Sequence, residues 1–126
     1  MKKTLQIITC FILITSCTSD GFNLSSNPKI ELINTWLESH EEEYGMFRPS
    51  DYKKFPDSMF RQSYTFLENN KCEYLVLSPV DAHYIEKSLW EYNEESNSIN
   101  IYNLNNKLIQ TLKIIKLSNE LLQLEI

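Results

Sequence analysis

Glycine is scarce in this chain: Gly21 and Gly45 are the only two among 126 residues. A phosphate-binding loop needs several glycines close together so that backbone N–H groups can approach the phosphates, and two isolated glycines exclude one. The sequence also lacks the Gly-x-Ser-x-Gly motif of serine hydrolases and any Cys-His pairing typical of thiol enzymes. We therefore predict that the protein is not an enzyme and uses no cofactor.

Positive charge is also scarce. Lys and Arg together number 12, against 17 Asp and Glu, and the formal net charge is -5 at pH 7. Residues 1–16 contain Lys2 and Lys3 and no acid, so a chain without them has a formal charge of -7. Phosphate recognition relies on clustered Lys and Arg, and no such cluster occurs in the sequence. Nucleic acid is therefore not a predicted partner.

Long apolar runs are missing except near the start, where residues 5–14 are almost entirely apolar and follow Lys2 and Lys3. This run is too short to span a bilayer, which takes about 20 apolar residues. A short positive head followed by a short apolar segment is the layout of a secretory signal. We predict that residues 1–16 are a signal peptide.

The apolar run ends in Ile14-Thr15-Ser16-Cys17, which resembles the lipobox of bacterial lipoproteins. The resemblance implies cleavage before Cys17, a diacylglycerol on its sulfur and a fatty acyl chain such as palmitate on the new amine. Cys17 would then anchor the protein in the bacterial cell envelope, in the outer membrane. The alternatives are an ordinary signal cleavage, for which an Ala-x-Ala site is missing, and a disulfide. With Cys10 removed and Cys17 lipidated, Cys72 has no partner within the chain, so no disulfide is predicted.

Two segments follow the predicted signal. Residues 17–29 are rich in Ser and Asn and show no apolar period, which predicts a lipidated, flexible tether. Residues 30–126 form the predicted domain, in which short alternating runs are separated by Asn-, Asp- and Pro-containing breaks. The alternation predicts about seven strands, at residues 35–41, 62–67, 72–77, 84–92, 99–102, 108–117 and 121–126. We predict an all-β antiparallel meander that forms a small barrel or a curled sheet, because exposed strand edges recruit other chains.

A helical period competes with the strand interpretation in two segments. Ile30, Ile33 and Trp36 are spaced for one face of a helix, and residues 108–124 can be fitted to the same period. In the second segment the β-branched residues and the break at Ser118-Asn119 favour strands. In the first, a short helical turn that leads into a strand at Trp36 remains open.

The stretch MFRPSDYKKFPDSMFRQSYTF (residues 46–66), followed by CEYLVLSP and SLWEY, is similar to small bacterial lipocalin-like lipoproteins. Those proteins carry an Arg-Pro pair, a Phe-Pro pair, an arginine before an aromatic strand and a later Trp strand, in this order. The resemblance covers residues 36–126 and implies a lipocalin-like barrel that binds a small ligand. The alternative is a structural or protein-interaction lipoprotein whose barrel is fully packed.

Candidate ligand-binding residues are aromatic side chains on the predicted strands, with one arginine beside them: Tyr64, Phe66, Tyr74, Tyr84, Trp90 and Arg61. Ligand pockets combine aromatic walls with a few polar groups, so this set suits a small apolar or sugar-like ligand. Tyr84 and Trp90 are the best candidates for the rim of such a pocket. The alternative, which we favour for a domain of this size, is that the aromatic residues form the core.

Arginine occurs only at Arg48 and Arg61. Either guanidinium could bind a carboxylate ligand with two parallel hydrogen bonds. The structural alternative, which we favour, pairs Arg48 with the acidic residues 41–43 and places Arg61 over Trp36 or Trp90.

Histidine occurs only at His40 and His83. If these residues lie in strands, His40 shares a face with Glu42, and Asp81 shares a face with His83. A hydrolase that uses His40, Asp81 or His83 is therefore a marginal alternative. Catalytic zinc takes three protein ligands in defined geometry, and this spacing does not supply them, so no metal site is predicted. Cys72 alternates with apolar residues and is predicted to be a small buried hydrophobe rather than a reactive thiol.

Overall fold

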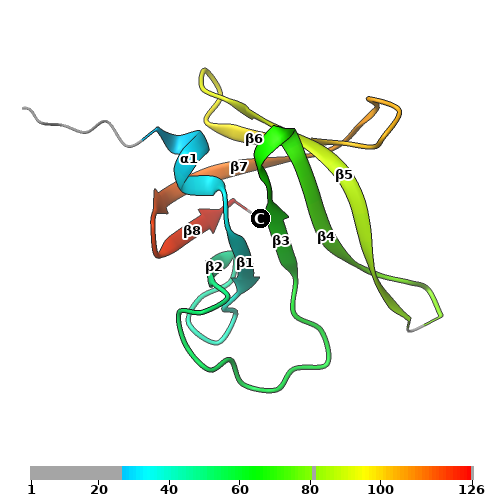
Figure 1. Ribbon diagram of the computed structural model, residues 1–126. Helices are drawn as coiled ribbons and strands as arrows, with labels where there is room; N and C mark the ends of the chain where they lie inside the picture. Colours follow the sequence, from blue (N-terminus) through cyan, green and yellow to red (C-terminus); the bar gives the residue numbers. More distant parts are fainter. Residues whose placement is uncertain (1–26, 81, 126) are drawn as a thin grey trace, which may run out of the picture.

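The computed structural model describes residues 27–80 and 82–125 (Figure 1). The predicted signal peptide, Cys17 and most of the predicted tether lie outside the described residues, as does Asp81. The described elements are, in chain order, α1 (Pro28–Leu32), β1 (Thr35–Glu38), β2 (Met46–Pro49), β3 (Ser63–Phe66), the 3₁₀ turn η1 (Glu68–Asn70), β4 (Lys71–Leu77), β5 (His83–Asn93), β6 (Ser98–Tyr102), β7 (Leu108–Ser118) and β8 (Leu121–Leu124). Within this part of the chain, no helix has the length and apolar character that a membrane crossing requires.

The eight strands form a closed antiparallel barrel in the order β1-β2-β8-β7-β6-β5-β4-β3, in which β3 pairs back with β1. Strands β3 to β8 follow one another as a meander. The β1–β2 hairpin is inserted the other way round, so that β1 lies between β2 and β3 while β2 pairs with β8. Residues 50–62 therefore carry the chain past β1, from the end of β2 to the start of β3. This order differs from the simple up-and-down order of a lipocalin barrel.

The predicted fold class is confirmed, because the described chain is an all-β antiparallel barrel with one short α-helix. All seven predicted strands are present, with ends that differ by at most three residues. The alternation does not predict the eighth strand, β2, which has four residues and ends in Pro49, a residue that usually marks the edge or end of a strand. Pro28 and Lys29, the last two residues of the predicted tether, belong to α1.

The helix α1 lies at one end of the barrel and is joined to it through Trp36 (Figure 1). The Asn27 side chain caps the helix by accepting a hydrogen bond from the backbone N–H of Lys29 at 3.1 Å, and Pro28 occupies the first turn, where no backbone donor is needed. Leu32 is fully buried, and its carbonyl accepts a hydrogen bond from the Trp36 indole at 2.9 Å. The helical turn before the Trp36 strand is thus confirmed.

Asparagine provides most of the left-handed backbone positions in the described turns, and Gly45, with a φ of 79°, provides another. Asn69, Asn70, Asn97 and Asn106 have φ values of 62°, 61°, 48° and 62°. Asn tolerates this region better than most residues that have a Cβ atom. The Asn97 side chain also donates a hydrogen bond to the Ile114 carbonyl at 3.1 Å, which ties the β5–β6 turn to β7. A chain with two glycines therefore builds tight hairpins with asparagine.

Large side chains fill the barrel interior near α1. Trp36, Phe66 and Trp90 are at most 1% exposed, and the rings of Phe66 and Trp90 lie 5.0 Å apart between centroids. The Trp90 indole donates a hydrogen bond to the Leu67 carbonyl at 2.9 Å, so its one polar group is satisfied. The rest of the buried cluster is Leu32, Phe47, Tyr64, Cys72, Ile99, Ile101, Ile114, Leu122 and Leu124. The end of the barrel near α1 is therefore a packed core, which Phe47, Tyr64 and Leu124 continue toward the opposite end.

The long strand β5 takes part in two portions of the barrel. Its residues up to Leu89 pair with β4, and its residues from Leu89 onward pair with β6. Because β6 ends at Tyr102, opposite Leu89, the β4–β5 hairpin continues beyond the other strands (Figure 1). The barrel is therefore closed near α1 and splayed at the other end.

Candidate ligand site at the open end of the barrel

The side chains that point into the barrel change from apolar to polar along the strands. Because alternate residues of a strand point to the same face, Trp36 on β1 is followed inward by Glu38, and Tyr64 on β3 is preceded inward by Gln62. The backbone N–H of Glu38 donates to the Gln62 carbonyl at 2.9 Å, so the two residues are neighbours. The apolar interior near α1 thus gives way to carboxylate, amide and phenol groups at the opposite end.

This opposite end holds an open pocket of about 280 Å³, which we call the mouth pocket. Its lining residues are Glu38, Tyr44, Phe47, Phe60, Gln62, Tyr64, Leu112, Leu124 and Glu125. The aromatic and aliphatic members form apolar walls, to which the others add two carboxylates and an amide. Apolar walls with a few placed polar groups are the usual composition of a small-molecule site, and the volume is at the low end of the usual range. The mouth pocket suits a compact ligand.

Tyr64 forms the boundary between the mouth pocket and the core. It is 7% exposed, and its ring centroid lies 5.6 Å from that of Phe47 and 6.2 Å from that of Tyr74. Burial raises the pKa of Tyr64 to about 12, and the carboxylate of Glu38 adds to the rise. The phenol therefore stays protonated at neutral pH and can donate a hydrogen bond.

The charged groups that line the mouth pocket are both acidic. Glu125 forms an exposed salt bridge with Lys113, with 3.5 Å between Nζ and Oε2. Glu38 makes no salt bridge with any residue in the described part of the chain. Arg61 lies nearby, but it donates to the main-chain carbonyl of Glu38, at 2.5 Å, and not to its carboxylate. Glu38 therefore brings to the pocket a carboxylate that no salt bridge with a described residue occupies, although the Arg61 charge interacts with it at longer range.

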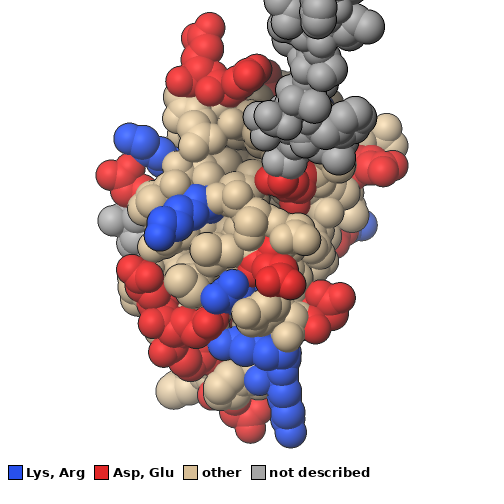
Figure 2. All heavy atoms as spheres, turned by 90° about the vertical axis from the view of Figure 1, so that its left-hand side faces the viewer, with Lys and Arg blue, Asp and Glu red and all other residues tan. Residues whose placement is uncertain are grey.

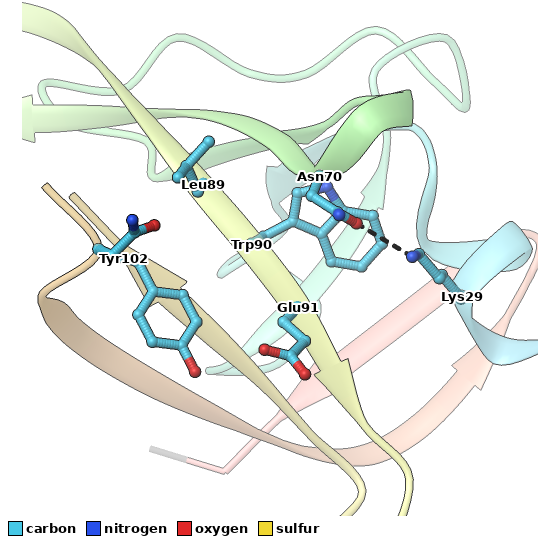
Figure 3. Close-up of a pocket in the computed structure, with 7 residues that line it drawn as sticks. Lys29, Asn70, Leu89, Trp90, Glu91 and Tyr102 are labelled. Atoms are coloured by element: carbon cyan, nitrogen blue, oxygen red, sulfur yellow. Dashed lines mark hydrogen bonds between the residues drawn. The ribbon is translucent and has the colours of Figure 1, made fainter. Parts of the chain in front are cut away.

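A second hollow, of about 470 Å³, lies near the start of β4 and is shown in Figure 3. Lys29 and Asn70 point toward one another there, and the Lys29 ammonium donates to the Asn70 side-chain oxygen at 3.0 Å. The ammonium also lies 5.9 Å from the centroid of the Trp90 ring. Because Trp90 is 1% exposed, its ring is covered and does not offer a stacking surface to a ligand. We therefore regard the mouth pocket as the stronger candidate.

The structure separates the predicted ligand-binding aromatic residues. Tyr64, Phe66 and Trp90 all belong to the buried core cluster, as the favoured alternative predicts, and of these three only Tyr64 also lines the mouth pocket. Tyr74 is half-buried beside Tyr64, and Tyr84 is 47% exposed on the part of β5 that projects beyond the barrel. These aromatic residues lie on β3, β4 and β5 at different heights along the barrel. They therefore do not form a single site.

The mouth pocket also contains residues that the sequence does not single out. Glu38, Phe47 and Leu112 come from three different strands, and Phe60 comes from the connection between β2 and β3. The sequence contained one clue to this set of residues. If residues 35–41 form a strand, Glu38 points to the same inward face as Trp36. The others are brought together only by the pairing of distant strands.

Arg48 stabilises the loop between β1 and β2. Its Nε and Nη2 atoms donate to the Glu42 carboxylate at 3.0 and 3.1 Å, and the Lys53 ammonium lies 3.4 Å from the same carboxylate. The hydrogen bonds from Arg48, and then that from Ser39, lower the pKa of Glu42 to about 2. The predicted pairing of Arg48 with the acidic residues 41–43 is confirmed.

Arg61 is engaged in a similar way by Glu41, to whose carboxylate it donates two hydrogen bonds. It also donates to the Pro56 carbonyl at 2.7 Å and lies 5.1 Å from the centroid of the Phe55 ring. The prediction that Arg61 covers a tryptophan is wrong, because the carboxylate of Glu41 draws the guanidinium to the loop side. Its hydrogen bonds go to protein groups, and it is not among the residues that line the mouth pocket.

His40 lies beside a carboxylate, His83 contacts an aromatic ring, and Cys72 belongs to the buried core. His40 lies 4.0 Å from Glu41, and His83 contacts the edge of the Phe60 ring at 5.5 Å between centroids. Residues 27–80 and 82–125 contain no group of three or more potential metal ligands. Cys72 is 1% exposed, and burial raises the pKa of its thiol to about 11. The prediction of a buried Cys72 is confirmed.

Acidic and basic groups alternate on the face of the molecule that carries α1 and β8. Figure 2 shows acidic side chains spread over this face, with Lys and Arg side chains between them. This face is a mixed, solvated surface.

Comparisons with known proteins provide no relative from which a function could be transferred. No protein-family model matches the chain, and neither a curated protein nor a solved structure matches it. The resemblance to lipocalin-like lipoproteins therefore stays a prediction that rests on short motifs.

Proposed function

We propose that this protein is a lipid-anchored β-barrel of the bacterial cell envelope that binds a small ligand in its mouth pocket. The observation that carries the proposal is the pocket of about 280 Å³ at the open end of an otherwise filled barrel. A packed core beneath an open pocket holds the lining side chains in place before the ligand arrives, which reduces the entropy lost on binding. The motif likeness to lipocalin-like lipoproteins supports the same kind of function.

We propose binding rather than catalysis. The Tyr64 hydroxyl, one of the groups that line the pocket, has a pKa of about 12, which keeps it protonated and weakly nucleophilic at neutral pH. The Cys72 thiol has a pKa of about 11 and is buried in the core cluster. General acid–base catalysis works best with groups whose pKa is near the working pH, and these two groups are far from it.

The place of the mouth pocket in the fold suits a tethered protein. The helix α1 precedes β1, and Glu38, at the far end of β1, lines the pocket. A lipid on Cys17 is linked to the barrel through α1, so the pocket lies at the end of β1 away from the link. We propose anchoring at the outer membrane, on its periplasmic or its surface side.

Native mass spectrometry tests the ligand proposal on the chain carrying Cys17→Ser, purified without lipid from its own host. We expect a retained small molecule in addition to the mass of the protein. Leu112→Trp, which fills the pocket, should lose the retained molecule. Leu104→Trp is the matched control, because Leu104 is 66% exposed in the β6–β7 turn. A single protein mass with no bound species counts against the proposal.

A second candidate function is protein interaction through the projecting β4–β5 hairpin. Leu77, Val80, Tyr84 and Ile85 are 49%, 82%, 47% and 51% exposed at and near its tip. Leu77 and Ile85 lie on one face of the hairpin and Tyr84 on the other, so apolar side chains are exposed on both faces near the tip, where a partner protein could contact them. A packed barrel core agrees with this candidate as well as with a ligand binder.

A photo-reactive side chain at position 80 tests the second candidate in host cells. If the hairpin is a docking site, illumination should produce a covalent adduct of one defined mass. The same group at position 104, on the exposed β6–β7 turn, is the control. Equal labelling at both positions would argue against a specific partner.

A further inference from the structure

The mouth pocket presents negative charge without a positive partner of its own. Glu38 and Glu125 line it, and none of its lining residues is Lys or Arg. Lys113 compensates Glu125 on the exposed side, at 3.5 Å. Glu38 makes no salt bridge with any residue described, and the nearby Arg61 is bound to Glu41. One carboxylate at the pocket is thus available to a ligand.

The aromatic rings of the mouth pocket are likewise without a cation. The cation–aromatic contacts of the described residues involve the rings of Trp90, Tyr52 and Phe55, none of which lines this pocket. Phe47 and Tyr64 pack at a tilt of 54° and form a two-ring wall next to Glu38. Phe47 and Tyr64 are only 3% and 7% exposed, so they form an apolar wall beside the Glu38 carboxylate, a setting that suits the apolar body of a cationic ligand.

We propose that the ligand of the mouth pocket is a small organic cation, a protonated amine or a quaternary ammonium ion on a compact apolar body. Its charge would lie at Glu38, and its apolar body would contact Phe47, Tyr64 and Leu112. An anionic ligand would meet two carboxylates and no basic side chain, which opposes its binding. The net charge of -5 also favours the approach of a cation. This inference rests on the proposed ligand-binding function of the pocket.

Three phenyl compounds of similar size test the inference: phenethylamine, which is cationic at pH 7, neutral 2-phenylethanol and anionic phenylacetate. Each is titrated into the full chain carrying Cys17→Ser, and the backbone amide shifts of Glu38, Gln62 and Leu112 are followed by NMR. We expect the amine to bind about tenfold more tightly than the alcohol, as a favourable charge contact would give, and the anion to bind most weakly. Glu38→Gln should remove the advantage of the amine and leave binding of the alcohol unchanged.

Glu95→Gln is the matched control, since it removes the same charge from the exposed β5–β6 turn. Equal binding of amine and alcohol by the unmodified pocket would overturn the cation inference and leave the ligand-binding function standing. A loss in Glu95→Gln as large as that in Glu38→Gln would also overturn it, because the effect would then come from net charge. If none of the three compounds shifts the mouth-pocket amides, the cation inference fails, whereas the proposed function is decided separately by the retained molecule in native mass spectrometry.

Discussion

The charged side chains of this protein differ in whether they form a salt bridge with a group of opposite charge. Arg48 and Arg61 each bind a carboxylate, of Glu42 and Glu41 respectively, and hold the loop between β1 and β2. Glu38, two residues after the buried Trp36, has no such partner among the described residues. The paired carboxylates stabilise the fold, whereas the unpaired one is available for binding.

The paired carboxylates predict a loss of stability in acid. The pKa values of Glu41 and Glu42 are lowered to about 2 from 4.5 by hydrogen bonds from Arg61 and Arg48. A lowered pKa in the folded state stabilises the fold above pH 4.5, and this contribution is lost as the pH falls from 4.5 to 2. In urea unfolding, Glu42→Gln should be less stable than the unmodified protein at pH 7, and the difference should shrink toward pH 2. A difference that does not vary with pH would contradict this account, and Glu95→Gln is the control.

The Cys72 thiol is expected to resist alkylation in the folded protein. It is 1% exposed and has a pKa of about 11, so little reactive thiolate is present or accessible at pH 8. Peptide mapping after iodoacetamide treatment should find Cys72 unmodified in the native chain and modified in urea. Rapid modification of native Cys72 would show that the core opens around it.

At the scale of elements, turn chemistry and strand pairing decide which parts are rigid. The β3–β4, β5–β6 and β6–β7 turns contain asparagine at positive φ, and α1 is held by the hydrogen bond from the Trp36 indole to the Leu32 carbonyl. The strand β5 pairs along its whole length, with β4 first and β6 afterwards. The resulting splay leaves the open end at which the mouth pocket lies.

The β6–β7 turn gives a direct test of the role of asparagine. Asn106 has a φ of 62°, and its backbone N–H donates to the Asn103 carbonyl at 3.0 Å. Asn106→Gly should be tolerated, since glycine adopts this backbone freely. Asn106→Val should lower the free energy of unfolding by about 1–2 kcal/mol, the usual cost of left-handed backbone at a residue with a Cβ atom. Urea denaturation of both variants measures the difference, and equal stability of the two would contradict the turn assignment.

At the scale of the whole molecule, the barrel has a packed end that carries α1 and an open end that carries the mouth pocket. The insertion of β1 between β2 and β3 brings Glu38 next to Gln62 and Phe47 close to Tyr64. The candidate site is thus a product of barrel closure. If the proposed anchor is present, the link to the membrane and the ligand site lie at opposite ends of β1.

The anchor itself is testable on the intact chain in its host. With Cys17 as the attachment point, metabolic labelling with radioactive palmitate should label the protein, which should fractionate with the outer membrane. Cys17→Ser should abolish labelling and release the protein from the membrane fraction, whereas Cys10→Ser should change neither after processing. Labelling that persists in Cys17→Ser would exclude this attachment point.

The sequence by itself determined the all-β class, seven of the eight strands and the turns between those seven, because period-two alternation and asparagine-rich breaks are local signals. It also identified Cys72 as buried and Arg48 as a partner of residues 41–43, since these assignments depend on near neighbours. The lipobox resemblance at Cys17 is likewise a local pattern and stays a prediction.

Only the tertiary structure decided the position of β2, the order of strands around the barrel and the residues of the mouth pocket. Glu38, Phe47 and Leu112 are far apart in the chain and meet because β1, β2 and β7 close into one barrel. Arg61 likewise finds Glu41, twenty residues away, instead of a tryptophan. Long-range pairing depends on how all the strands close together, and no short stretch of sequence contains that information.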